Sequence, residues 1–350
     1  MCPPLSHLEA GVETMTSSIG KPVLILGGSG IVGAKAAQIL RQLYPDLPIA
    51  IGGRDMAKAK SVADAIGNAT AVTIDLERAD LGQDADAAYS AIAVFVKDVT
   101  LNSMKYAQAH SLPYLSVSSG VFEVGPEMAL AISKPNAAPI LMASNWLAGA
   151  ATFPALQEVR QFKSVDEIVI TVVLDEEDMG GPAAFADFQR LTEVAPNPLL
   201  LVDGHWRWIK DDETKRNFVD IDGTAVEASA YSPLDVLSLS TATDAKSIRV
   251  DLVYGMSASR RRGEAFSTEI AIEISGENLN GQPTQTRLDV VHPEGQAPLT
   301  ALHVALGIER LLGLYGGQPV KPGLYLPDAL MDPDYVVRRM REFGAVFKRK

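Results

Sequence analysis

The chain has 350 residues, of which 47% are hydrophobic and 21% are charged, as is usual for a globular protein of one or two domains. Its formal net charge of −12 disfavours nucleic acid and anionic membrane surfaces as partners, because phosphate groups would be repelled. The one cysteine, Cys2, excludes an intrachain disulfide and a Cys-x-x-Cys metal site. We therefore expect a cytoplasmic protein that binds no metal, nucleic acid or membrane.

Residues 1–20 contain no Lys or Arg and no long apolar segment, although a secretory signal needs both. No later stretch approaches the roughly 20 consecutive apolar residues of a membrane-spanning helix. We expect residues 1–20 to be an N-terminal extension that precedes the first strand of the fold.

An apolar run at 23–26, a glycine-rich segment at 27–33 and a helical pattern at 34–40 follow one another directly. The glycines match the Gly-x-Gly-x-x-Gly spacing of a dinucleotide-binding turn between a strand and a helix. The first glycine permits a tight turn, the second lets the backbone approach a pyrophosphate, and the third lets the helix pack closely on the strand. The helix N-terminus then offers its free N–H groups to the phosphates. The expected phosphate-binding residues are Gly28, Ser29, Gly30, Ile31, Val32 and Gly33.

Short apolar strands alternate with longer helical segments between residues 21 and 150, a pattern typical of a parallel, doubly wound sheet. This segment is therefore predicted to form a Rossmann domain that binds NAD or NADP. The expected strands are 23–26, 48–53, 71–74, 87–96, 113–117 and 139–143, and the expected helices are 34–40, 56–66 and 101–110.

The residues after the second expected strand indicate which dinucleotide binds. An acidic residue there binds the free ribose 2′-OH of NAD, whereas a basic residue accommodates the 2′-phosphate of NADP. Gly53 occupies this position and Arg54 follows, whose planar guanidinium suits a phosphate dianion. We therefore expect NADP rather than NAD; in the alternative, Arg54 caps the loop and Asp55 contacts the ribose. Asp75, after the third strand, is expected either to accept a hydrogen bond from the adenine or to be a surface or helix-cap residue.

The fourth and fifth expected strands end at the sheet edge where the nicotinamide of a dinucleotide lies. Ala93, Val94 and Phe95 end the fourth strand, and small apolar side chains there would let the ring approach the backbone. Lys97 follows them and is our first candidate for a catalytic acid or base; the alternative is a solvated loop lysine. Ser118 follows the fifth strand and is a candidate for orienting a carbonyl or carboxylate; the alternative is a hydrogen bond within a turn.

After residue 161 the pattern changes to β-branched runs separated by turn signals, which is typical of a mixed or antiparallel sheet. The expected elements are strands at 168–174, 199–209, 247–254, 268–274 and 284–291, and a helix at 182–191. A later helix is expected at 301–314, with Thr300 as its N-cap and Gly316-Gly317 at its end, and a final helix at 333–347.

We therefore expect an α/β fold in which one domain interrupts another. The N-terminal Rossmann domain, a doubly wound parallel sheet, comprises residues 21–150 and 298–350, because the last helices return to it. Residues 151–297 form an inserted α+β substrate and dimerisation domain, with a homodimer as the expected assembly. The run Arg260-Arg261-Arg262 in this domain is either a site for a substrate carboxylate or a solvated charge run.

Three segments, spread over most of residues 21–335, follow a known pattern. They are the glycine-rich start at Gly27 with Gly-Arg-Asp after the second strand, the segment 113–118, and the late segment 322–328 after a long helix. In these segments the chain resembles the saccharopine dehydrogenase-like family of NAD(P)-dependent oxidoreductases, although Ser116 stands where the family usually has aspartate. The resemblance implies a Rossmann domain interrupted by a substrate domain, and hydride transfer to or from a carbon that bears nitrogen.

The expected function is that of an NADP-dependent oxidoreductase acting on an amino acid-derived or related small carbonyl or imine substrate. One alternative is an enoyl or keto reductase acting on an acyl or carrier-bound substrate, which would need a long apolar tunnel between the domains. A second alternative is a non-catalytic protein that binds NADPH, since the sequence shows no clear pair of acid and base residues.

Overall fold

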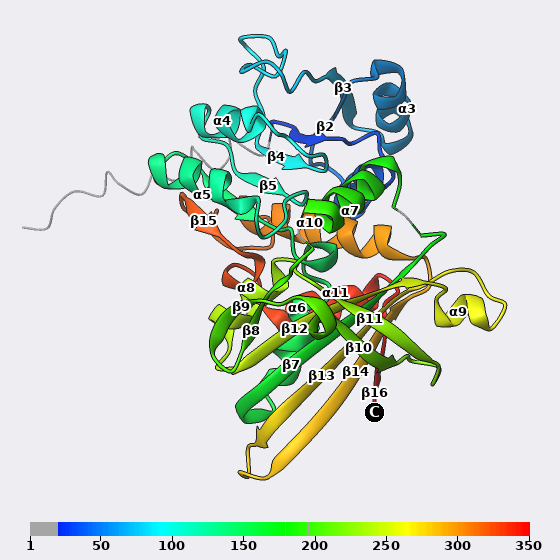
Figure 1. The fold of residues 1–350 in the computed structure, drawn as a ribbon. Helices are drawn as coiled ribbons and strands as arrows, with labels where there is room; N and C mark the ends of the chain where they lie inside the picture. The colour runs from blue at the N-terminus through cyan, green and yellow to red at the C-terminus, as the bar shows by residue number, and fades with distance from the viewer. Residues whose placement is uncertain (1–19, 179, 195) are drawn as a thin grey trace, which may run out of the picture.

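The structure is a computed structural model that describes residues 20–178, 180–194 and 196–350. It contains two β-sheets, here called sheet A and sheet B, which are joined through a set of helices (Figure 1). Apart from Gly20, the expected N-terminal extension lies outside the described residues. The expected α/β fold class is confirmed, because sheet A has the strand order of a Rossmann domain and sheet B is mixed.

Sheet A is a seven-stranded sheet in which each pair of neighbouring strands is parallel. Its central strand β1 lies between β4 and β2, so the chain reverses its direction of winding there. Ligands of such sheets bind in the crevice at the carboxyl ends of the strands next to this reversal. In spatial order the strands are β15 (Gly323–Tyr325), β6 (Pro139–Met142), β5 (Tyr114–Ser116), β4 (Ala91–Val94), β1 (Val23–Leu26), β2 (Ile49–Gly53) and β3 (Ala69–Thr73).

Helices cover both faces of sheet A (Figure 1). Along β1, Val23 and Ile25 pack with α2 and α10, whereas Leu24 and Leu26 belong to the core formed with α4 and α5. Both faces of the strand are thus buried, which explains its uninterrupted apolar sequence. The α-helices are α2 (Ile31–Leu43), α3 (Met56–Ile66), α4 (Asn102–Ala109), α5 (Val124–Ser133), α6 (Thr152–Val159), α7 (Pro182–Val194), α8 (Asp235–Ala242), α9 (Ala258–Arg261), α10 (Gln296–Leu312) and α11 (Pro333–Glu342).

Sheet B contains nine strands of the described chain, and its long strands β7, β12, β13 and β14 form the centre. Two strands, β8 and β9, form a hairpin at its side, and the short 3-10 helices η1 (Trp146–Gly149), η2 (Asp211–Thr214) and η3 (Pro327–Ala329) lie in connections. The strands are β10 (Lys215–Val219), β11 (Ala225–Tyr231), β12 (Ser247–Gly255), β7 (Phe162–Asp175), β13 (Thr268–Asn278), β14 (Pro283–His292), β16 (Val346–Arg349), β8 (Leu199–Val202) and β9 (His205–Trp208).

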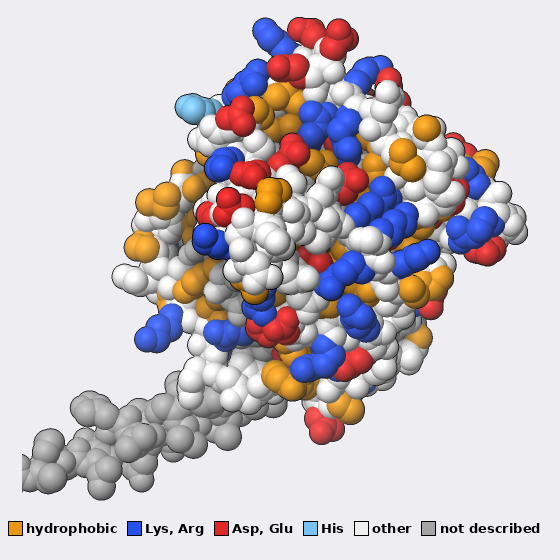
Figure 2. All heavy atoms as spheres, turned by 90° about the horizontal axis from the view of Figure 1, so that it is seen from below, with side chains coloured by type: hydrophobic (Ala, Val, Ile, Leu, Met, Phe, Trp, Pro, Cys, Tyr) orange, Lys and Arg blue, Asp and Glu red, His pale blue; other side chains and the backbone are white. Residues whose placement is uncertain are grey.

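The β10–β11 hairpin is tied to the face of sheet B that points away from the main core. Arg216 of β10 donates to Asp251 of β12 at 2.8 Å and lies 3.4 Å from the carboxylate of Glu273 in β13. Phe218 is buried, with the guanidinium groups of Arg216 and Arg287 at 5.7 and 5.1 Å from its ring centroid. Figure 2 looks onto the end of the molecule that sheet B forms, where Lys and Arg side chains are interspersed with Asp and Glu.

Helix α10 joins the two sheets into one packed unit. It packs along α2 and continues the core of sheet A into the inner face of sheet B, and the last strands then divide between the sheets. Strand β15 pairs with β6 in sheet A, whereas β16 pairs with β14 in sheet B. None of the helices in the described ranges is long and apolar enough to cross a lipid bilayer.

Two expectations about the late helices were wrong. Helix α10 begins at Gln296 rather than after Thr300, because the buried Asp178 carboxylate caps it from another segment and accepts the Gln296 N–H at 2.7 Å. The helix ends at Gly313, whose left-handed backbone closes it before Gly316-Gly317 is reached.

The expected final helix at 333–347 was also too long. Helix α11 ends at Glu342, and Gly344 turns the chain, with a φ of 99°, into strand β16. The expected strand at 199–209 is the β8–β9 hairpin, with its turn at Asp203-Gly204. Strands β10 and β11 and helix α8 had no counterpart among the expected elements.

His303 gives the fold a testable dependence on pH. Its ring is buried in α10 and stacks on Phe153 with 6.0 Å between ring centroids, and burial lowers its pKa to about 4 from an ordinary value of 6.5. As the pH falls below about 6.5, the unfolded state binds a proton that the folded state excludes, so stability falls by up to about 1.4 kcal/mol per pH unit.

We expect His303→Leu to reduce the loss of unfolding free energy between about pH 7.5 and about pH 5.5, because the buried titrating group is gone. Urea denaturation at both pH values measures this loss. The exposed His205 provides the control, and His205→Leu should keep the wild-type dependence on pH. An unchanged dependence in His303→Leu would contradict the assignment.

Candidate functional site

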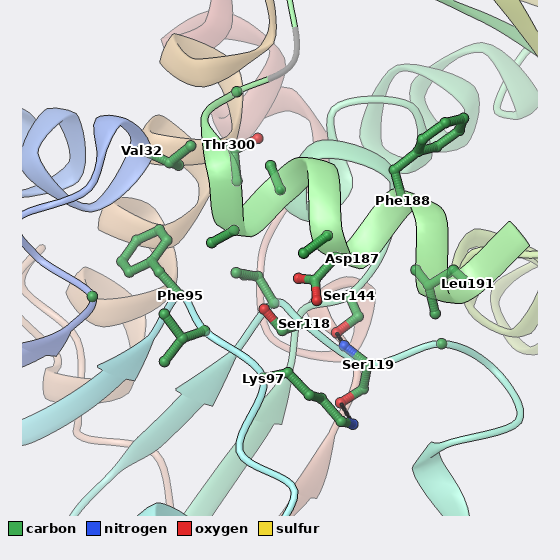
Figure 3. A pocket seen from close by; sticks show the side chains of 18 of the residues that line it. Val32, Phe95, Lys97, Ser118, Ser119, Ser144, Asp187, Phe188, Leu191 and Thr300 are labelled. Atoms are coloured by element: carbon green, nitrogen blue, oxygen red, sulfur yellow. Dashed lines mark hydrogen bonds between the residues drawn. The ribbon is translucent and has the colours of Figure 1, made fainter. Parts of the chain in front are cut away.

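A cavity of about 1680 Å³ lies where the carboxyl edge of sheet A meets helix α7 and strand β11. Its walls come from the turn between β1 and α2, the loops after β2, β3, β4, β5 and β6, and the start of α10. Helix α7 crosses the cavity, and its side chains Asp187 and Leu191 lie opposite Ser118 and Lys97 (Figure 3). The cavity is therefore at the position that the strand order of sheet A indicates for a ligand.

The glycine-rich turn forms one end of the cavity, and its shape depends on two glycines. A Cβ on Gly33 would lie 2.4 Å from the carbonyl oxygen of Gly27, and one on Gly30 would lie 3.2 Å from the same oxygen. Gly30 occupies the N-cap position of α2, and no side chain caps the first N–H groups of the helix. Uncapped N–H groups facing a cavity suit a pyrophosphate, so these residues fit a dinucleotide.

Five of the six expected phosphate-binding residues line the cavity. They are Ser29, Gly30, Ile31, Val32 and Gly33. Gly28 does not line it; a Cβ there would lie 2.8 Å from the Ile25 carbonyl oxygen, so this glycine serves the packing of the turn on the sheet.

The loops after β2 and β3 line the same end of the cavity and carry its charged side chains. Arg54, Lys58, Asp75 and Glu77 all line it. Arg54 is exposed and makes no hydrogen bond with any other residue in the described ranges. Asp55 instead caps α3, because its carboxylate accepts the Lys58 N–H at 3.1 Å. Arg54, the basic residue expected after β2, thus lines the cavity, whereas the carboxylate of Asp55 caps helix α3.

The end of β4 contributes less to the cavity than the sequence predicts. Phe95 lines it together with Val96, whereas Ala93 and Val94 are fully buried between the neighbouring strands and helices and do not reach it. The wall beside a bound dinucleotide therefore consists of the residues just after the strand, because the strand itself lies inside the sheet core.

Lys97 is held in a cluster of polar residues rather than being solvated in a loop. Its Nζ lies 3.3 Å from Ser119 Oγ (Figure 3). It also lies 3.3 Å from Glu123 Oε2. Ser119 Oγ in turn donates to Glu127 Oε1 at 2.5 Å. Glu127 is buried in α5, and burial raises the pKa of its carboxyl. A hydrogen-bonded chain thus runs from the cavity wall at Lys97 to a buried acid.

Ser118 lies opposite helix α7 and close to Asp187 (Figure 3). Burial raises the pKa of the Asp187 carboxyl, although a hydrogen bond with Ser118 and the charge of Arg190 oppose this rise. Arg190 donates to Asp187 at 2.7 Å and to Glu123 at 2.7 Å, and its second nitrogen lies 3.3 Å from the Ser118 carbonyl oxygen. Arg190 thus fastens α7 to the loop after β5 and to the start of α5.

Several cavity residues were missed by the sequence analysis. Ser144 follows β6 at the same sheet edge as Ser118, so the rule that singled out Ser118 could have found it. Asp187 and Tyr231 come from α7 and β11 of the second part of the fold, and no motif marks them. Burial raises the pKa of the Tyr231 phenol, and the nearby charge of Asp187 adds to this rise.

No protein-family model and no curated protein matches the sequence. Among solved structures, saccharopine dehydrogenase (L-Glu forming) from Saccharomyces cerevisiae is 13% identical to this chain, with a TM-score of 0.68 over 95% of this chain and 100% of that chain. An amine dehydrogenase from Mycobacterium smegmatis is 10% identical, with a TM-score of 0.49 over 89% of this chain and 96% of that chain.

The first of these likenesses shows the fold. It confirms the architecture that the resemblance to the saccharopine dehydrogenase-like family predicts, in which a Rossmann sheet is followed by a second sheet and then rejoined by the chain.

The close approach at Gly33 yields a stability prediction. We expect Gly33→Ala to lower the free energy of unfolding by about 1–3 kcal/mol, because its Cβ would force α2 away from the Gly27 carbonyl. Gly125→Ala in α5 is the matched control, since a Cβ there meets nothing within 4 Å.

The control should be neutral or stabilising by up to about 1 kcal/mol, as Gly to Ala changes in helices usually are. Urea denaturation of the two variants measures the difference. Equal stabilities would contradict the close packing at Gly33.

Proposed function

We propose that the protein is an NADP-dependent oxidoreductase that reduces or oxidises a small carbonyl or imine compound. One observation carries the proposal: a single cavity has a phosphate-binding helix terminus at one end and the Lys97 cluster at the other. In sheets with this strand order a dinucleotide binds with its phosphates at the turn after β1 and its nicotinamide beyond β4. The fold shared with saccharopine dehydrogenase supports the same conclusion.

The preference for NADP rests on Arg54. Its side chain lines the cavity, where it would meet the ribose 2′-phosphate of NADP. Lys58 lines the cavity too, but its Nζ lies 3.8 Å from the carboxylate of Asp55. Asp55, the residue that could have bound the free ribose of NAD, caps helix α3 instead. Because no carboxylate in the described ranges pairs with Arg54, its guanidinium can bind a phosphate dianion without breaking an ion pair with one of them.

A bound nicotinamide dinucleotide supplies or accepts the hydride in such a reaction. In this proposal the Lys97 ammonium group gives a proton to the carbonyl oxygen or imine nitrogen as the carbon is reduced. Ser119 and the buried Glu127 lie behind Lys97 in the hydrogen-bonded chain. Once Lys97 has given up its proton, Ser119 Oγ passes its own proton to the free amine and takes one from the protonated carboxyl of Glu127. Ser118, at the end of the neighbouring strand β5, orients the same polar atom of the substrate.

The cofactor preference can be tested with Arg54→Ala. Loss of a charged hydrogen bond to phosphate should raise the Kd of NADPH about 10- to 100-fold, while the Kd of NADH changes by less than about threefold. Fluorescence titration measures both constants. Lys60→Ala is the control, since Lys60 is exposed on α3, pairs with Asp64 and does not line the cavity. A preference for NADH in the wild type would overturn the assignment.

The catalytic role of Lys97 can be tested with Lys97→Met. We expect at least about a 100-fold loss of turnover with little change in NADPH affinity, because only the proton donor is removed. NADPH oxidation over a panel of carbonyl, imine and enoyl compounds measures turnover. Lys105→Met, a change at an exposed lysine outside the cavity, should be silent.

Glu127→Gln should lower turnover less, by about tenfold, since it interrupts only the supply of protons to Lys97. NADPH binding without turnover on the whole panel would instead favour a non-catalytic protein. Full activity of Lys97→Met would show that another group donates the proton.

A further inference from the structure

The substrate end of the cavity has an unusual balance of charge. We define this end by Lys97, Ser118, Phe122, Asp187, Leu191 and Tyr231, all of which line the cavity. Among the described lining residues at this end, Lys97 and Asp187 carry the charges, and the larger side chains are aromatic or aliphatic. The substrate must therefore match a wall that is mainly apolar and has one charged group of each sign.

Both cations near this end already have carboxylate partners. Lys97 Nζ lies 3.3 Å from Glu123, with the two side chains only 18% and 17% exposed. Arg190 lies 2.7 Å from Glu123 and 2.7 Å from Asp187. The charges of Lys97 and Arg190 are thus matched by the carboxylates of Glu123 and Asp187, at N···O distances of 2.7 to 3.3 Å. In the described chain, neither cation is left over for an anionic substrate.

The arginine run in and just after helix α9 does not change this balance. Arg260 of α9 pairs with Asp175 at 2.7 Å and Arg262 pairs with Glu264 at 2.9 Å, while Arg261 pairs with Asp222 at 2.7 Å. None of the three lines the cavity. The run was expected to be either a substrate-carboxylate site or a solvated charge run, whereas its three guanidinium groups pair with carboxylates of the protein.

A substrate carboxylate would therefore be costly to bind here. It would have to lose its hydration in a partly enclosed site and take Lys97 or Arg190 away from a carboxylate that is itself poorly hydrated. Separating Arg190 from Glu123 would also release α7 from α5. An uncharged group makes neither demand, and it can replace water against Phe122 and Leu191.

We infer that the substrate end of this cavity takes an uncharged carbonyl or imine compound with an apolar body, and discriminates against carboxylates such as amino-dicarboxylic acids. This inference rests on the proposed function, because it concerns the partner of the cofactor in the same cavity. The polar atom of the substrate lies between Lys97 and Ser118, and its apolar body lies along the inner side of α7.

A matched pair of ketones tests the inference by binding alone. Octan-2-one and 7-oxooctanoate have the same chain, and differ in a methyl group against a carboxylate at the far end. Saturation-transfer NMR titrations give their Kd values for the cofactor-free and the NADPH-saturated protein. We expect octan-2-one to bind at least about tenfold more tightly in both states, because only the carboxylate must break an ion pair.

Two variants of α7 sharpen the test. Leu191→Arg adds an unpaired cation to the cavity wall and should shift the ratio of the two Kd values at least about tenfold towards 7-oxooctanoate. Gln189→Arg adds the same cation at an exposed position of α7 outside the cavity, and should leave the ratio within about twofold.

Equal or tighter binding of 7-oxooctanoate by the wild-type protein, or no binding of octan-2-one up to its solubility limit, overturns the inference. The proposed function fails in a different way, through the absence of NADPH binding or turnover. The ratio of the two ketones' Kd values in the cofactor-free protein depends neither on NADPH binding nor on turnover.

Discussion

The contact between the start of α2 and the end of β1 fixes the geometry on which the cavity depends. Gly33 lies so close to the Gly27 carbonyl that no side chain fits between them, and this places the uncapped end of α2 directly over the edge of the sheet. Helix α10 packs along α2 and extends to sheet B, so the same contact also sets where the second sheet lies. The packing of α2 on β1 and of α10 on α2 therefore sets how far the phosphate-binding end of the cavity lies from the substrate end.

A second constraint holds the far side of the cavity. Glu123 receives both Lys97 and Arg190, so one carboxylate connects the loop after β4, the start of α5 and helix α7. Partly buried pairs of this kind are screened little by salt and are costly to break singly. These ion pairs keep Lys97 turned towards Ser119. They also hold α7 over the cavity, which matters because α7 has no buried residue of its own to anchor it.

The parts of the fold that the sequence predicted well are those set by local spacing. The expected helix at 56–66 matches α3 in both bounds, because Asp55 caps its start and Gly67 ends it within the same segment. A second rule, that the carboxyl ends of parallel strands share one edge, correctly predicted that Lys97, Ser118 and Arg54 lie near one another at the cavity. Tertiary packing decided the rest.

Asp178 starts α10 five residues earlier than the local pattern indicates, and it lies more than a hundred residues away in the chain. The side of α7 that faces the cavity, and hence the role of Asp187, depends on how two sheets meet. Strand β10 begins with the consecutive polar residues Lys, Arg and Asn, and Arg216 has partners in β12 and β13 only because the hairpin lies over those strands. No spacing rule within one segment contains this information.

The late strands β15 and β16 have a consequence for how the chain acquires its structure during synthesis. Each occupies an outer position in its sheet, β15 beside β6 and β16 beside β14. Until residues 323–349 have left the ribosome, both partner strands present unpaired N–H and C=O groups, which are open to pairing with other chains. Both sheets therefore acquire their last strand only after nearly all of these 350 residues have been made, although sheet A begins at residue 23.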